Sequence, residues 1–200
     1  MYLAMPTGEI QTDAIVRHAF EAGKLVYVPY LYKSTNSATP PRVMDMVSLH
    51  DLGDYEALKR DRWGIPSVDP SSMLERHRVL GDEGHPATLK VILDLIIMPG
   101  VAFDRDPASG TIRRLGHGKG FYDYFIEQYA KGLSSTNVPV EHSSSGQRLS
   151  GLRYGLALTE QRLPSESGEE VPVGPFDQPL DGLILGNGEI LESPKGPNTT

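Results

Sequence analysis

The chain has 200 residues and a formal net charge of -7, from 26 acidic and 19 basic side chains. It contains no cysteine, which excludes disulfide bonds, thiolate nucleophiles and cysteine-bound zinc. The acidic balance argues against bulk binding to nucleic acid or to an anionic membrane, but it leaves room for a local basic site. No apolar run approaches the roughly 18 residues that a membrane span needs. We therefore expect a cytoplasmic protein, with a mitochondrial location left open, and neither nucleic acid nor membrane as a partner.

The first part of the chain has the pattern of a strand, a helix and a second strand. Residues 2–5 are predicted to form a short strand, after which Thr12 caps a helix that ends at Ala22, before Gly23. Residues 25–29 are rich in β-branched side chains and form the next buried strand. This order predicts a parallel sheet with a right-handed crossover. Because a domain seldom begins in a buried strand, we also expect a further segment upstream of it.

The centre of the chain alternates loops with apolar segments. Residues 33–42 are polar and proline-rich and are predicted to form a surface loop, residues 43–49 a strand, and residues 71–80 a helix. The strongest strand signal is at residues 91–98, which are apolar almost throughout, as expected of a central parallel strand covered on both faces.

The remainder of the chain predicts one amphipathic helix and three strands. The helix begins near Gly120, repeats aromatic and apolar residues at steps of three and four, and ends at Gly132. The other predictions are strands at 154–158, 182–185 and 189–191, a hairpin turn at Asn187 and Gly188, a mobile insertion at 133–152 and a disordered tail at 192–200. Together the elements predict the α/β class, as a three-layer α/β/α sandwich with a mainly parallel, Rossmann-like sheet.

Three alternating glycines between strand and helix are the most informative feature: Gly116, Gly118 and Gly120. Glycine lets the backbone approach a ligand closely, and the N-terminus of the following helix favours an anion. Basic side chains in the same stretch make phosphate the natural ligand; they belong to Arg113, Arg114 and Lys119. The fingerprints of P-loop and dinucleotide-binding proteins both fail here, so a tight turn at a helix start, without a ligand, stays an alternative.

Asp123 follows this turn inside the first turn of the helix. A carboxylate beside a triphosphate is a common way to hold Mg²⁺, which takes one or two carboxylates and keeps several waters. The alternative is an ordinary acidic residue at a helix N-terminus, where the dipole favours it.

Two segments carry a resemblance to a known family. Residues 96–104 (IIMPGVAFD), followed by residues 114–123 (RLGHGKGFYD), resemble the signature of the 5-formyltetrahydrofolate cyclo-ligase family. Shorter matches follow in the same order as in that family and extend the resemblance over roughly residues 2–185; they include residues 2–5, 8–12, 23–24, 28–29, 44–47, 63–66, 156–158, 171–173 and Asp181. The resemblance implies one cyclo-ligase-like α/β domain at residues 1–191.

The family converts 5-formyltetrahydrofolate into 5,10-methenyltetrahydrofolate, consumes ATP and needs Mg²⁺, so the resemblance implies these substrates and this metal. It makes Lys119 the catalytic cation and Asp123 and Asp177 the metal ligands. The implied ATP-binding residues are Arg114, Leu115, Gly116, His117, Gly118, Lys119, Gly120, Phe121 and Tyr122. The implied substrate-binding residues are Leu3, Glu9, Trp63, His117, Gly118 and Phe121.

The chain departs from this family at its start. Members normally begin with a helix whose basic residues reach the nucleotide phosphates, well upstream of the segment around Glu9, and we expect it to be missing here. A folate- or nucleotide-binding protein without turnover is therefore an alternative, as is a sugar-phosphate isomerase or sensor on a similar sheet. We expect a monomer.

Overall fold

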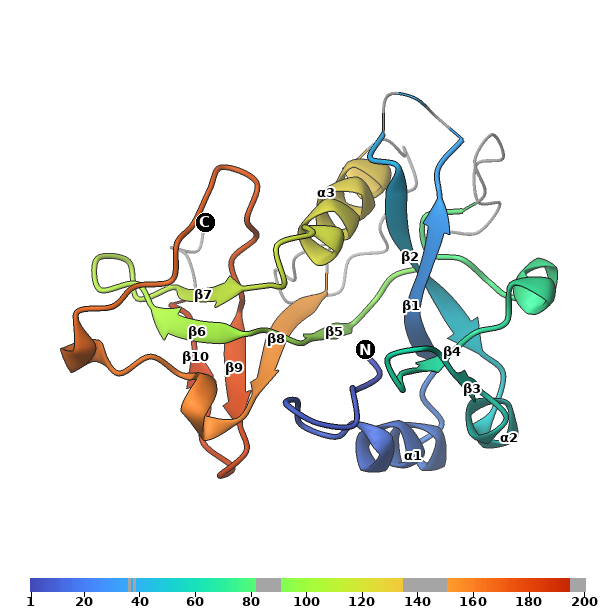
Figure 1. The fold of residues 1–200 in the computed structure, drawn as a ribbon, viewed down its shortest axis with the longest axis horizontal. Coiled ribbons are helices and arrows are strands. Elements are labelled where there is room, and N and C mark those ends of the chain that lie inside the picture. Colours follow the sequence, from blue (N-terminus) through green and yellow to red (C-terminus); the bar gives the residue numbers. More distant parts are fainter. Residues whose placement is uncertain (36, 38, 82–90, 135–150, 195–200) are drawn as a thin grey trace, which may run out of the picture.

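A computed structural model of the protein describes residues 1–35, 37, 39–81, 91–134 and 151–194. Its helices are α1 (Asp13–Glu21), α2 (Leu52–Glu56) and α3 (Phe121–Ser134), with short 3-10 helices at Pro70–Glu75, Thr159–Gln161 and Ser165–Ser167. The strands are β1 (Val26–Lys33), β2 (Arg42–Leu49), β3 (Lys59–Arg60), β4 (Pro66–Ser67), β5 (Leu95–Met98), β6 (Ala102–Arg105), β7 (Ile112–Leu115), β8 (Leu152–Ala157), β9 (Gly182–Leu185) and β10 (Ile190–Glu192). In Figure 1, the elements up to β4 gather on one side of the molecule and β5 to β10 on the other.

The N-terminal half is built on an antiparallel pair of strands. β1 and β2 pair along their whole length, from Val26 opposite Leu49 to Lys33 opposite Arg42. Only residues 34–41 join them, which is too short for the crossover that parallel strands require. The predicted parallel β-α-β beginning, from residues 2–5 through a helix to residues 25–29, is wrong, because residues 2–5 belong to no strand and β1 pairs with β2 instead. Residues 2–5 form no strand, although the Tyr2 N–H donates to the Ile97 carbonyl at 3.2 Å and so docks this segment on β5.

The C-terminal half contains a four-stranded sheet in the order β10-β9-β8-β5. β5 pairs with β8, and β8 with β9, in parallel, whereas β10 returns antiparallel to β9 through the predicted turn, where Gly188 has a φ of +88°. Sheets formed by β1–β2, β3–β4 and β6–β7 are two-stranded and antiparallel. The α/β class is confirmed. The four-stranded sheet has two parallel pairings and one antiparallel pairing, whereas the other sheets of the described residues are small and antiparallel. The three-layer, Rossmann-like arrangement stays a prediction.

Helix α3 packs between the two halves (Figure 1). Phe125, Ile126 and Tyr129 bury their side chains in the same core cluster as Met44 and Met46 of β2, which also includes residues of β5, β6 and β9. The predicted helix is confirmed in its start and its apolar face. Its predicted end at Gly132 is wrong, because a glycine inside a helix costs only about 1 kcal/mol and packing outweighs it.

Several other expectations change at their boundaries. The strand expected at 91–98 is limited to β5, which lies at the edge of its sheet, and the helix expected at 71–80 is replaced by the 3-10 helix Pro70–Glu75. The tail expected at 192–200 begins too early, since Glu192 belongs to β10; residues 195–200 and residues 135–150 of the expected insertion lie outside the described part. Within the part of the chain that the structure describes, no helix is both long and apolar enough to cross a membrane.

Candidate functional site

The glycine turn joins the end of β7 to the start of α3 and is open to solvent. Gly118 and Gly120 have φ angles of +74° and +61°, in the left-handed region that favours glycine. A Cβ added at either position would meet no described atom within 4 Å, and His117 and Lys119 are also exposed. The turn therefore presents its backbone outward, where a ligand can approach it.

Helix α3 continues this turn and adds a favourable potential for anions. A helical hydrogen bond runs from the Tyr124 N–H to the Gly120 carbonyl at 2.9 Å. The amides before Tyr124 lie in the first turn, where helix N–H groups have no partner within the helix and the positive end of the dipole lies. A phosphate beside Lys119 would meet both this potential and a full positive charge.

Arg114 lies beneath the turn rather than on its surface. Its exposed fraction is 8%, and its guanidinium donates to Asp123 Oδ2 at 2.8 Å and to the Pro99 carbonyl at 3.3 Å. The guanidinium carbon also lies 5.7 Å from the centre of the Tyr122 ring. Gly116 fits against it, because a Cβ there would lie only 2.9 Å from Arg114 Nη1. The Arg114 side chain therefore supports the turn from the protein interior.

One predicted metal carboxylate, Asp123, contacts the loop that carries the other, Asp177. Asp123 Oδ1 accepts the backbone N–H of Gln178 at 3.0 Å, and Gln178 directly follows Asp177. Asp177 in turn accepts the Gly174 N–H at 2.6 Å, which closes a tight turn. Within the described ranges, no group of three or more His, Asp or Glu side chains is arranged to hold a metal. Two carboxylates suffice for Mg²⁺ when phosphate and water supply the other ligands, and carboxylate oxygens keep spare lone pairs, so these residues fit that ion.

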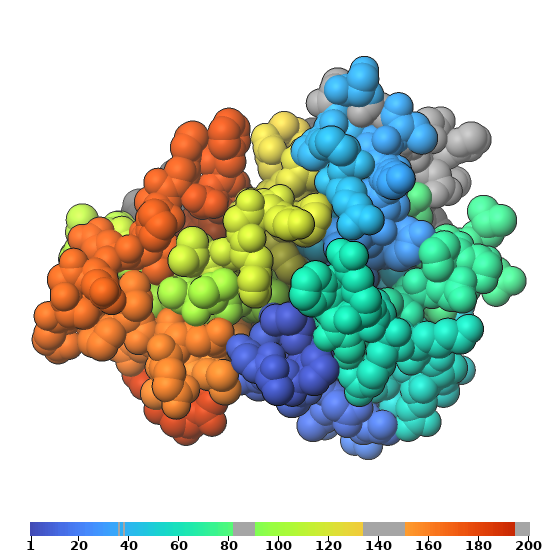
Figure 2. All heavy atoms as spheres, viewed as in Figure 1, coloured from blue at the N-terminus to red at the C-terminus, as the bar shows by residue number. Residues whose placement is uncertain are grey.

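Glu9 lies on a segment that is fixed close to the turn. Its carboxylate accepts the Met5 N–H at 2.8 Å, and the Gln161 side chain donates to the carbonyls of Gly8 at 3.4 Å and Gly100 at 2.8 Å. Burial raises the pKa of Tyr122, with Arg114 opposing and Glu9 adding to the increase. Figure 2 shows the N-terminal segment, in dark blue, on the same face as the yellow-green residues of the turn.

Trp63 and Leu3 differ sharply in their accessibility. Trp63, between β3 and β4, is 63% exposed, with the Arg62 guanidinium 5.2 Å from its ring centre. The next residue, Gly64, packs so closely on Pro6 that a Cβ there would lie 2.6 Å from the proline ring. Leu3 is only 6% exposed and belongs to the core cluster around β1 and β2. Its side chain is therefore used in packing.

The other predicted residues of the turn are half-buried. Leu115 ends β7, while Phe121 and Tyr122 begin α3 and pack on the two core clusters that meet there. Contacts link Asp123 to Arg114 below the turn and to Gln178 beside Asp177, while Glu9 is close enough to influence Tyr122. The roles expected of these residues stay predictions.

The comparisons with known proteins bear on this region. The sequence model of the 5-formyltetrahydrofolate cyclo-ligase family matches residues 1–185. The chain belongs to this family.

Individual relatives agree with that assignment. The chain is 32% identical, over 184 residues, to a protein of Schizosaccharomyces pombe named "Probable 5-formyltetrahydrofolate cyclo-ligase", covering 92% of this chain and 72% of the relative. A Caenorhabditis elegans protein of the same name is 32% identical over 185 residues, with coverages of 92% and 70%. The mouse 5-formyltetrahydrofolate cyclo-ligase is 28% identical over 177 residues, with coverages of 88% and 67%. These names are those of ligases, so the chain belongs to a family of enzymes.

In this member of the family, the expected role of one basic residue needs correction. Arg113 was expected to add its charge to the phosphate site, but it pairs with Asp104, and Arg114 pairs with Asp123. Among the described residues, Lys119 is the cation of the turn that makes no ion pair. Alternation along a strand could have revealed this, because neighbouring residues such as Arg113 and Arg114 point to opposite faces.

Proposed function

We propose that this chain catalyses the cyclisation of 5-formyltetrahydrofolate to 5,10-methenyltetrahydrofolate, with ATP and Mg²⁺, giving ADP and phosphate. The observation that carries the proposal is the open glycine turn at the N-terminus of α3, with Lys119 making no ion pair to any described residue, in a chain that matches the cyclo-ligase family over residues 1–185.

The turn is suited to hold and stabilise a phosphoryl group in transfer. The formyl oxygen of the substrate attacks the γ-phosphorus of ATP, and ADP leaves. The N10 amine then attacks the activated formyl carbon, the oxygen departs as phosphate, and the proton lost from N10 leaves with that phosphate. Lys119 would neutralise the charge on the transferred group, while the amides of Gly118 and Gly120 donate to its oxygens.

In the second step, the attack of N10 on the activated formyl carbon, the protein mainly has to position the folate, because both reacting groups belong to this one molecule. Glu9 offers carboxylate oxygens to the N–H groups of the pterin, and the exposed ring of Trp63 offers an apolar face. Phe121 and His117 line the approach to the turn. Holding N10 against the activated carbon then supplies a large effective molarity.

Asp123 and Asp177 are the residues that would hold Mg²⁺, which when bound neutralises phosphate charge. Arg114 keeps Asp123 in place from below, and Gln178 from the side. The chain therefore supplies a negative charge for this ion and also fixes the orientation of the Asp123 carboxylate.

Turnover by the purified chain tests the proposal. 5-Formyltetrahydrofolate, ATP and Mg²⁺ are supplied, and the absorbance of methenyltetrahydrofolate is followed together with phosphate release. Equal amounts of both products, lost on omission of ATP, support the cyclo-ligase. Binding of both substrates without product supports a binding protein instead. Isomerisation of a sugar phosphate in the absence of ATP supports the alternative of a sugar-phosphate isomerase. Monomeric state and cytoplasmic location remain predictions.

A further inference from the structure

The segment that carries Asp177 is tied to the rest of the molecule at defined points. The Val171 N–H donates to Asp104 Oδ2 at 2.9 Å, and the Gln178 N–H donates to Asp123 Oδ1 at 3.0 Å. Val171 is only 2% exposed, so its bond lies away from water. We call residues 171–178 the acid loop, since Asp177 lies between these two anchors.

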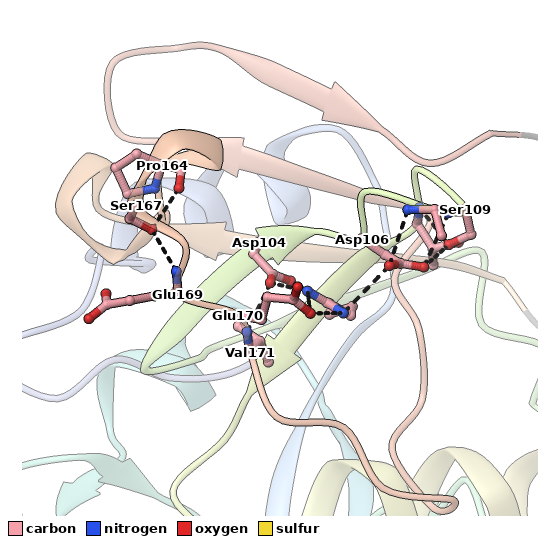
Figure 3. A network of polar contacts seen from close by, with 11 residues as sticks. Asp104, Asp106, Ser109, Pro164, Ser167, Glu169, Glu170 and Val171 are labelled. Carbon is pink, nitrogen blue, oxygen red and sulfur yellow. Dashed lines mark hydrogen bonds and ion pairs between the residues drawn. The ribbon is translucent and has the colours of Figure 1, made fainter.

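Asp104, which lies on β6, is fixed by a bidentate contact with Arg113 on β7. Arg113 Nε donates to Asp104 Oδ1 at 2.7 Å, and Arg113 Nη2 donates to Asp104 Oδ2. Glu170, one residue before the acid loop, lies 3.3 Å from Arg113 Nη1, and Asp106 lies 3.5 Å from it. Figure 3 shows Asp104, Glu170 and Val171 gathered around this contact, between the β6–β7 hairpin and the chain that follows Ser167.

The arrangement at the two ends of the acid loop is the same. At each end, an arginine of β7 holds a carboxylate, and that carboxylate accepts a backbone N–H of the loop: Arg113 and Asp104 hold Val171, and Arg114 and Asp123 hold Gln178. The two arginines are neighbours on one strand, so they reach opposite faces of the hairpin.

Two anchors, Asp104 on β6 and Asp123 on α3, each bound by an arginine of β7, define the loop geometry more closely than either one alone. Between them, Pro172 and Pro175 restrict the backbone, and the Gly174–Asp177 turn fixes the direction of the chain. Arginine suits the task because its planar fork gives a defined orientation to the carboxylate that it binds.

We propose that Asp104 is a positioning residue of this enzyme: clamped by Arg113, it holds the start of the acid loop so that Asp177 stays beside Asp123. The role of Asp177 at Mg²⁺ rests on the proposed function. The anchoring of the acid loop by Asp104 does not depend on it. Groups that orient metal ligands from outside typically change metal affinity by 10- to 100-fold when they are mutated.

The variant Asp104→Asn keeps the shape of the side chain and removes its charge. Its matched control is Asp54→Asn, because Asp54 also accepts an arginine fork, from Arg76, and one backbone N–H, from His50, without touching the acid loop. Hydrogen exchange of the amides in residues 168–180 is measured alongside the Mg²⁺ concentration that gives half-maximal turnover.

We expect Asp104→Asn to speed exchange at Val171 and Gln178 and to raise the half-maximal Mg²⁺ concentration about tenfold. The control should change neither. In an Asp177→Asn background, Asp104→Asn should shift the Mg²⁺ dependence less than twofold further, because both act on the same ligand.

Equal effects of Asp104→Asn and Asp54→Asn on loop exchange, or full additivity with Asp177→Asn, would overturn the proposal. If Asp177→Asn leaves the Mg²⁺ dependence unchanged, its metal role fails, while the exchange data still decide whether the clamp holds the loop. Should Asp104→Asn not fold, Arg113→Lys keeps the charge but loses the fork, and unchanged exchange of the acid loop in that variant would also refute the clamp.

Discussion

Asp54 and Asp104 are held in the same way in the two halves of the molecule. Asp54 receives both terminal nitrogens of Arg76, at 2.6 and 2.7 Å, and the His50 N–H at 2.9 Å. Asp104 receives the fork of Arg113 and the Val171 N–H. What differs is the segment at the other end of the backbone bond: the start of α2 in one half, the acid loop in the other.

The comparison shows that the chemistry of an ion pair does not by itself indicate function. Both pairs are largely buried, and removing one partner of either pair leaves an uncompensated charge. Losses of stability should therefore be similar in the two halves. Losses of turnover should occur only where the anchored segment belongs to the site, and the following substitutions separate these two outcomes.

The largest effect on turnover is expected from Lys119→Ala. Lys119 is exposed on the turn and makes no ion pair among the described residues, so its removal should lower turnover about 100-fold or more, the range found for groups that stabilise developing charge. The free energy of unfolding, measured by thermal denaturation, should stay within about 0.5 kcal/mol of the parent value. Lys24→Ala, another exposed lysine outside the site, is the control. A comparable loss of stability and turnover would make Lys119 a structural residue instead.

Asp123→Asn should reduce both the stability of the fold and the rate of turnover. It leaves the guanidinium of Arg114 buried without its carboxylate, which we expect to cost about 3 kcal/mol, and it removes a proposed metal ligand, which should lower turnover at least tenfold. Asp54→Asn should cost a similar amount of stability and leave turnover unchanged at temperatures well below unfolding. Urea unfolding and the methenyltetrahydrofolate assay measure the two quantities. Loss of turnover in Asp54→Asn would show that the two halves are coupled.

The same contrast explains how far the sequence predicted this molecule. The glycine turn was predicted because Gly118 and Gly120 need a conformation that other residues rarely adopt, and α3 was predicted because its apolar period is long and regular. Local signals of that kind identify an element before any partner is known.

Pairing between distant segments left no such signal. The antiparallel pairing of β1 with β2, and the capture of Val171 by Asp104 across 67 positions, depend on contacts that only the folded chain creates. Arg113 and Arg114 looked equivalent in the sequence, yet one holds each end of the acid loop. Their separate roles follow from strand alternation once β7 is known.

A pH titration should distinguish the stabilising role of Asp54. Hydrogen bonding to Arg76 holds the pKa of Asp54 below its usual value, so the folded protein releases this proton more readily than the unfolded chain. The stability that it contributes is fully present above the unfolded pKa of about 3.9 and is lost as the pH falls through the folded value. The difference in unfolding free energy between the parent and Asp54→Asn should thus be constant from pH 7 to 5 and shrink below about pH 4. A constant difference down to pH 3 would contradict this assignment.

The smallest effect is expected from Arg17→Gln, which breaks contacts of the same chemistry at the surface. Arg17 bonds Asp13 at 2.9 Å and Glu56 at 2.6 Å, and its side chain is 39% exposed. Exposed pairs exchange protein contacts for water contacts and are screened by salt, so the free energy of unfolding should change far less than in Asp54→Asn, and by still less in 1 M salt. Calorimetry at low and high salt measures both. If Arg17→Gln costs as much as Asp54→Asn, then burial is not what makes the Arg76 and Arg113 pairs strong, and the bidentate geometry would have to account for their strength.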